Sequence, residues 1–177
     1  MKKVVLILLL KELMIQMTTN NYGDSFITPA ATVRWSHLMK PDDKFGNPHH
    51  SVTIIVTDEI QEQLDAALAS LSGTKINGLK TDPDTGETLV RFKNVLKARD
   101  GITKFPVLDS DDNATETTPF GTDVVRVRVT PALISRDNSV SFYMDKIQLI
   151  ERNWAPSEES GGGGMGRVDD GFVTAAT

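Results

Sequence analysis

A two-residue alternation of apolar and basic side chains constrains the fold of this chain more than any other feature. Residues 124–130 read VVRVRVT, so valines alternate with Arg126 and Arg128. Successive side chains of a β-strand point to opposite faces of the sheet. The segment therefore predicts a strand with one apolar face and one basic face.

A second segment, residues 87–99, repeats this pattern. Its basic face holds Arg91, Lys93, Lys97 and Arg99, and its apolar face holds Val90, Phe92, Leu96 and Ala98. Either segment alone is compatible with an ordinary solvated sheet surface. Two such strands in one small domain favour a basic stripe of the kind that binds phosphate groups.

Four further segments have the β-branched and aromatic composition of strands, with turn residues between them. The six predicted strands are 28–39, 51–57, 87–99, 102–108, 122–134 and 139–151. A loop is predicted at 41–48 and a turn at 80–86, because Pro, Gly, Asp and Asn gather there. Asp100-Gly101 predicts a hairpin between the third and fourth strands, and residues 136–138 predict one between the last two.

Residues 58–71 change to a helical period, with five apolar residues on one face. These are Ile60, Leu64, Ala67, Leu68 and Leu71. Asp58 and Gln61 are the predicted N-terminal capping pair, and Gly73 is placed to end the helix.

Six strands and one helix, without a βαβ alternation, predict a mainly β fold: an OB-fold-like antiparallel barrel of five to six strands with one inserted α-helix. We expect the barrel domain to span residues 26–154. A flexible segment should precede it at 1–25, where MKKVVLILLL imitates a secretory signal and translation from Met14 or Met17 is the alternative. A flexible, Gly-rich and acidic tail should follow at 155–177.

The net charge of -5 at first argues against a phosphate-containing ligand. The acidic residues are concentrated, however, in residues 58–65, in residues 109–116 and in the tail. The remaining segments are therefore free to be locally basic.

The patterns of several enzyme and metal-site classes are missing from the sequence. Because there is no cysteine, disulfide frameworks, thiolate metal sites and cysteine nucleophiles are excluded. The three histidines, His37, His49 and His50, lack a metal-ligand spacing. Residues 109–113 resemble part of a calcium loop but lack its central Gly and closing Glu. We predict a binding protein that is not an enzyme and uses no metal or cofactor.

Aromatic residues lie beside basic residues in several segments, and unpaired bases stack on exposed rings. Phe92 and Phe142 are expected in the core, whereas Trp35 and Phe105 are compatible with either core or surface. The candidate DNA-binding residues are Arg34, Trp35, Lys40, Lys44, Phe45, Arg91, Lys93, Lys97, Arg99, Lys104, Phe105, Arg126, Arg128, Tyr143 and Lys146. We expect these cations and rings to share one concave wall of the barrel.

Several phrases of the sequence resemble a known family. KPDDKFGNP, SVTIIV, ETLVRFKNVLKA, FPVLDSD, GTDVVRVRVTPALI and VSFYMDKIQLIE, in this order, are similar to the single-stranded DNA-binding proteins of short-tailed bacteriophages. The resemblance spans residues 29–154. It implies an OB-fold with an added helix, binding of single strands with little sequence preference, and a role in phage DNA replication, recombination and repair in the cytoplasm of an infected bacterium.

The resemblance also implies an acidic C-terminal tail that ends in an aromatic residue. The matching residues are Glu158, Glu159, Asp169, Asp170 and Phe172, although Arg167 interrupts the acids and five residues follow the Phe. Such a tail implies contacts with DNA polymerase, helicase-primase and recombination proteins. The sequence is also compatible with a homodimer. A plain solubilising tail is the alternative.

Two other functions compete with single-stranded DNA binding. A phage structural or assembly protein would use the small β-domain to bind protein, and a sugar- or peptide-binding barrel of the cell envelope would account for the apolar N-terminus. Neither alternative predicts a basic stripe beside exposed rings, which is the feature that favours DNA.

Overall fold

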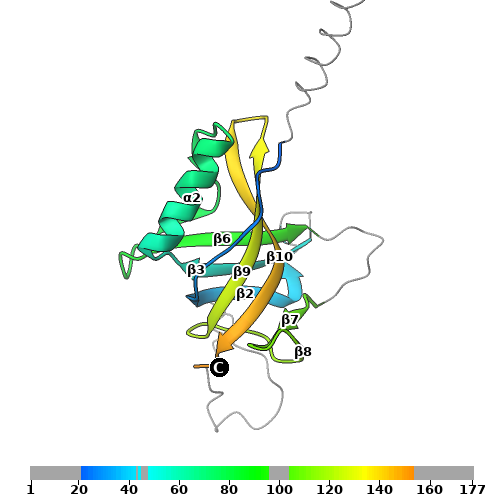
Figure 1. The fold of residues 1–177 in the computed structure, drawn as a ribbon. Helices are drawn as coiled ribbons and strands as arrows, with labels where there is room; N and C mark the ends of the chain where they lie inside the picture. The colour runs from blue at the N-terminus through cyan, green and yellow to red at the C-terminus, as the bar shows by residue number, and fades with distance from the viewer. Residues whose placement is uncertain (1–20, 43, 45–47, 96–103, 154–177) are drawn as a thin grey trace, which may run out of the picture.

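The computed structural model describes residues 21–42, 44, 48–95 and 104–153. Within these residues one helix accompanies a single mixed β-sheet (Figure 1). The elements are β1 (Phe26–Ile27), β2 (Ala31–Asp42), β3 (His49–Ile55), α2 (Asp58–Ser70), β4 (Lys75–Ile76), β5 (Leu79–Thr81), β6 (Thr88–Val95), β7 (Val107–Leu108), β8 (Ala114–Thr115), β9 (Val124–Ile134) and β10 (Ser139–Glu151).

Five long strands close into a barrel, in the order β2, β3, β6, β10, β9 and back to β2. Four of the five neighbouring pairs are antiparallel. The fifth pair, β6 with β10, is parallel and is recorded at one register position, Lys93 with Tyr143. The predicted OB-fold-like barrel with one inserted helix is therefore confirmed, but the prediction that it is wholly antiparallel is wrong at this junction.

The alternation in β9 has the predicted consequence. Val125, Val127 and Val129 have no exposed surface, whereas Arg126 and Arg128 are exposed. The predicted hairpin with β10 is also confirmed, since Ser139 pairs with Ile134 and the pairing continues down both strands. Burial of one face of a strand fixes this register, because a slip of one residue would expose every valine.

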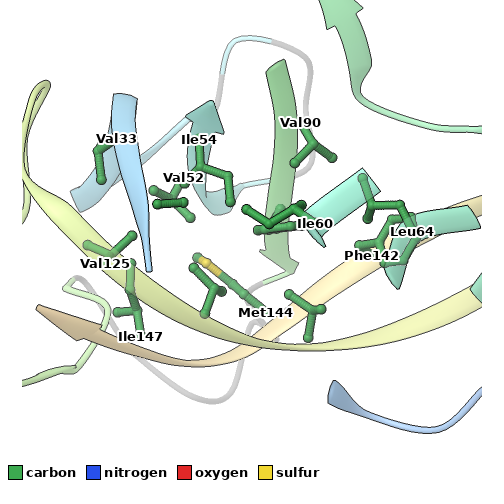
Figure 2. Close-up of a cluster of buried hydrophobic side chains, with 14 of the residues drawn as sticks. Val33, Val52, Ile54, Ile60, Leu64, Val90, Val125, Phe142, Met144 and Ile147 are labelled. Carbon is green, nitrogen blue, oxygen red and sulfur yellow. The ribbon is translucent and has the colours of Figure 1, made fainter. Parts of the chain in front are cut away.

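The core lies inside the barrel and under the helix, as Figure 2 shows. Phe92 of β6 and Phe142 of β10 are buried there, as predicted, with ring centroids 6.1 Å apart in an edge-to-face arrangement. Ile60 and Leu64 of α2 reach the same cluster. In Figure 1 the helix lies beside the end of the β9–β10 hairpin.

Both ends of α2 differ from the prediction in detail. Thr57 is the N-cap, because its side chain accepts a hydrogen bond from the backbone N–H of Ile60 at 3.4 Å. The predicted partner Gln61 instead donates to Asp65. At the other end Ser72 has the left-handed backbone, with φ of 52°. Gly73 is needed for space instead, since a Cβ there would lie 2.5 Å from Val140 Cγ2.

The predicted strands differ from the observed ones in their boundaries, in their number and in one pairing partner. β2 continues to Asp42 through the predicted start of the loop. β4 was not predicted, and β5 overlaps the first two residues of the predicted 80–86 turn. β7 pairs with β10 and β8, whereas the predicted hairpin required pairing with β6. The turn proposed at Asp100-Gly101 lies outside the described residues.

The N-terminal part of the described chain is attached to the barrel. The Asn21 carbonyl accepts a hydrogen bond from Leu133 N at 2.7 Å, and Gly23 N donates to the Pro131 carbonyl at 2.9 Å. Residues 21–25, which we assigned to the N-terminal segment, therefore pack with β9. Across the described ranges no helix has the length and hydropathy needed to span a membrane.

Candidate nucleic-acid interface

A hollow of about 360 Å³ lies over β2, β3, β5 and β6. We call it the Trp35 hollow; its lining is Trp35, His37, Ser51, Thr53, Gly78, Leu79, Lys80 and Arg91. Cross-strand register brings its central residues together, because Trp35 pairs with Thr53 and Thr53 pairs with Arg91. An indole and a guanidinium from distant parts of the chain thus share one row of the sheet.

Trp35 points away from the core and is 44% exposed. A register irregularity between Val33 and Trp35 accompanies this change of face, since Val33 is buried. The structure thus resolves the alternative left open for Trp35 in favour of the surface. Lys80 Nζ lies 4.6 Å from the ring centroid and Arg34 Cζ lies 5.7 Å from it, within the range of cation–π attraction.

Arg34 is held beside the indole by an ion pair. Its guanidinium lies 3.2 Å from Asp82, whose side chain is only 4% exposed. The backbone N–H of Asp84 lowers the pKa of Asp82, and the Arg34 charge lowers it further, so the carboxyl stays ionised. Arg34 is therefore already paired with Asp82 while it lies beside the indole.

The row two residues further along the strands extends the site to β10. His37 pairs with Ser51, Ser51 with Lys93, and Lys93 with Tyr143. Lys93 Nζ lies 5.7 Å from the Tyr143 ring centroid. Burial lowers the pKa of Lys93, and the nearby charge of Arg91 lowers it further. A phosphate placed between the two cations would relieve their mutual repulsion.

A second hollow, of about 370 Å³, lies over β9 and β10. We call it the Arg126 hollow; its lining is Ile27, Ser110, Asp112, Arg126, Arg128, Lys146 and Gln148. Arg128 pairs with Lys146 across the two strands. Lys146 lies 3.0 Å from Asp112, whereas neither arginine forms an ion pair with another described residue.

The two hollows share no lining residue. The single concave wall predicted for Arg91, Lys93, Arg126 and Arg128 is therefore divided: Arg91 lines one hollow, Arg126 and Arg128 line the other, and Lys93 lines neither. The physical reason is the closure of the sheet, because β10 stands between β6 and β9. Of these four cations, Arg91 shares its hollow with Trp35 and Lys93 lies beside Tyr143, whereas no ring lines the hollow of Arg126 and Arg128.

The other predicted site residues have different surroundings. Phe105 is 5% exposed and lies against His50, with ring centroids 5.8 Å apart, so it belongs to the core and presents no face to a base. Lys104 donates hydrogen bonds to Glu116, and Lys40 and Lys44 are exposed outside both hollows. The predicted residues outside the described ranges are Phe45, Lys97, Arg99, Glu158, Glu159, Asp169, Asp170 and Phe172.

Lys80 and His37 line the Trp35 hollow but are not among the binding residues predicted from the sequence. Lys80 was assigned to a turn, but it lies on β5, which pairs with β6 and so borders the Trp35 hollow. Pairing between β5 and β6 depends on register, and no local pattern in residues 79–81 reports it. His37 had a signal, since it is two residues from Trp35 and shares its face.

The closed five-stranded barrel has one helix, which is inserted in the chain between the second and third barrel strands, β3 and β6. This architecture defines an OB-fold domain. In chain order the barrel strands are β2, β3, β6, β9 and β10, and the Trp35 hollow covers the first three of them, including the face of the second and third. That face is where OB-folds hold oligonucleotides and oligosaccharides.

Comparison with solved structures identifies proteins of the same fold. A single-stranded DNA-binding protein encoded by bacteriophage T7 aligns with a TM-score of 0.53 and 19% identity, over 80% of this chain and 99% of that chain. The single-stranded DNA-binding protein from bacteriophage Enc34, in complex with single-stranded DNA, aligns with a TM-score of 0.54 and 12% identity, over 73% and 88%.

Another structure of the Enc34 protein aligns with a TM-score of 0.52 and 14% identity, over 78% of this chain and 87% of that one. The sequence matches no protein-family model and no curated protein. At these identities the likeness establishes the fold, and the fold implied by the resemblance to phage proteins is confirmed.

Proposed function

We propose that this protein binds single-stranded DNA through the Trp35 hollow, with little preference for base sequence. The observation that carries the proposal is the row Trp35, Thr53 and Arg91, continued by Lys93 and Tyr143 in the next row. It combines an exposed ring, on which any base can stack, with cations that bind the phosphates.

The mechanism requires no bond chemistry. Unpaired bases stack on the Trp35 indole, while the phosphate groups displace counterions from Arg91, Lys93 and Lys80. Duplex DNA hides the faces of its bases, so single strands are preferred. Bound protein would keep exposed template from folding on itself or reannealing.

The biological setting follows from the same proposal. The solved proteins that share the fold are named as phage single-stranded DNA-binding proteins, one of them in complex with single-stranded DNA. We infer a role in protecting single strands during phage replication and recombination, in the cytoplasm of an infected bacterium. Contacts with polymerase, helicase-primase and recombination proteins would use the acidic tail.

Titration of the full chain with a labelled oligothymidine and with its duplex, at two salt concentrations, tests the proposal. We expect tighter binding of the single strand and a steep loss of affinity with salt. Arg91→Ala with Lys93→Ala should lower the magnitude of the salt slope by about 1.4, because single strands lose about 0.7 per phosphate contact.

A charge-matched control, Lys75→Ala with Arg136→Ala, removes two exposed cations outside both hollows. It should leave the slope near that of the wild type. Failure of the wild-type protein to bind oligothymidine at low salt would reject the proposal and favour the alternative, a phage structural or assembly protein.

A further inference from the structure

The Arg126 hollow has the cations of a phosphate site without the ring of a base site. Arg126 and Arg128 are exposed and two residues apart on β9, and the only apolar residue in the lining is the aliphatic Ile27, 59% exposed. A single strand gains stacking energy from an aromatic ring, and the lining of the Arg126 hollow contains no ring. The hollow is therefore suited to phosphates whose bases are already stacked elsewhere.

An acidic residue interrupts the surface between the two hollows. Tyr143 pairs with Thr130, and Thr130 Oγ1 donates a 2.6 Å hydrogen bond to the carboxylate of Asp145. Asp145 is exposed and immediately precedes Lys146 of the Arg126 hollow. A single strand that ran evenly from one hollow to the other would carry its phosphates past this carboxylate, which disfavours a continuous path.

The separation of the hollows suits two nucleic-acid backbones. From Lys93 the register runs to Tyr143 and on to Thr130, which is two strand spacings, and Arg128 is two residues further along β9. Strand spacings of about 4.8 Å and a rise of about 3.3 Å per residue place Arg128 roughly 10–15 Å from Lys93 along the surface. The major groove, which separates the two backbones of duplex DNA, is about 12 Å wide.

We propose that the Arg126 hollow holds phosphates of a duplex that adjoins the single strand, so that the protein binds single-strand/duplex junctions more tightly than single strands alone. This inference rests on the proposed function, because the single-stranded arm occupies the Trp35 hollow. The second backbone of the duplex passes over Asp145 without contact and places its phosphates on Arg126 and Arg128.

The test compares an oligothymidine with the same oligothymidine attached to a hairpin duplex, using fluorescence anisotropy at one salt concentration. Two exposed arginine–phosphate contacts should make the junction bind about 2- to 30-fold more tightly. The junction should also have a salt slope larger in magnitude by about 1.8, since each duplex phosphate contact contributes about 0.9.

Arg126→Gln with Arg128→Gln should abolish this difference and leave the oligothymidine Kd unchanged. The control Lys75→Gln with Arg136→Gln should retain the difference in affinity between the junction and the oligothymidine. Equal weakening of both probes by the Arg126/Arg128 variant would overturn the inference, because it would place those arginines on the single strand. A wild-type junction affinity equal to that for oligothymidine would also overturn it, and would leave an acidic peptide as the ligand class.

These outcomes are separate from failure of the proposed function, in which the wild-type protein would not bind oligothymidine at all. Both arginines are exposed, so an unchanged thermal midpoint is expected for the variant. That measurement confirms that any loss of junction affinity comes from the hollow and not from unfolding.

Discussion

The ammonium group of Lys80 lies 4.6 Å from the centroid of the Trp35 ring, although the two residues belong to strands that do not pair with each other. β5 brings Lys80 through its pairing with β6, and β2 brings Trp35 through its pairing with β3. The contact therefore depends on the consecutive pairing of four strands, β2, β3, β6 and β5. It places a cation at the ring on which we expect a base to stack.

Trp35→Ala should weaken binding of oligothymidine about 5- to 150-fold, because stacking of one base contributes about 1–3 kcal/mol. Fluorescence anisotropy at constant salt measures the effect. Tyr22→Ala is the matched control, since Tyr22 is 59% exposed and lines neither hollow. An equal loss in both variants would mean that Trp35 has no special role.

Lys80→Ala should change the salt dependence more than the base preference. Loss of one phosphate contact lowers the magnitude of the slope of log K against log salt by about 0.7 on a single strand. Lys75→Ala serves as the control, because Lys75 lies 2.9 Å from Asp137 and lines neither hollow. A slope identical to that of the wild type would exclude Lys80 from the phosphate contacts.

Phe105→Ala should reduce the free energy of unfolding by about 3–5 kcal/mol, as expected for removal of a buried aromatic side chain. Urea denaturation measures it. Because the ring faces His50 in the core, the oligothymidine Kd of the folded variant should stay within about twofold of the wild type. A stable variant with weak DNA binding would return Phe105 to the interface.

Gly73→Ala should cost about 1–3 kcal/mol, because its Cβ would lie 2.5 Å from Val140 Cγ2 and 2.9 Å from Leu68 Cδ1. The adjacent Ser72→Gly should be neutral or stabilise by up to about 1 kcal/mol, since Ser72 has a left-handed backbone. The thermal midpoint should therefore fall for Gly73→Ala and stay unchanged or rise for Ser72→Gly. A destabilised Ser72→Gly variant would contradict the backbone argument.

The stability of the protein should depend on Asp137 at acidic pH. Hydrogen bonds from Ser139, and next from Lys75, lower the pKa of Asp137 from 3.8 to about 2. A lowered folded-state pKa contributes stability that is present above pH 4 and is lost as the pH falls towards 2.

Asp137→Asn lacks this ionisation. Its urea midpoint should therefore lie below that of the wild type at pH 5. The difference between the two midpoints, the gap, should narrow as the pH falls towards 2. A gap that stays constant across this range would show that the Asp137 charge does not contribute to stability.

Much of the fold could be predicted from local patterns. The faces of β9 and β6, the span of α2 and the β9–β10 hairpin each depend on residues that are close in sequence. One error is local, because Thr57 rather than the adjacent Asp58 caps the helix. The other arose where distant segments decide the structure, since β7 pairs with β10 instead of β6. Phe105 is buried in the core, and no pattern in the residues next to it in the sequence indicates this burial.

By itself the sequence determined which side of each strand is apolar, because side chains alternate along any β-strand whatever its partners. It therefore placed Arg91 and Lys93 opposite Val90 and Phe92, and Arg126 and Arg128 opposite the valines of β9. Only the tertiary structure decided which outward faces meet. Closure of the barrel buries the apolar faces of all five strands at once and places β10 between β6 and β9.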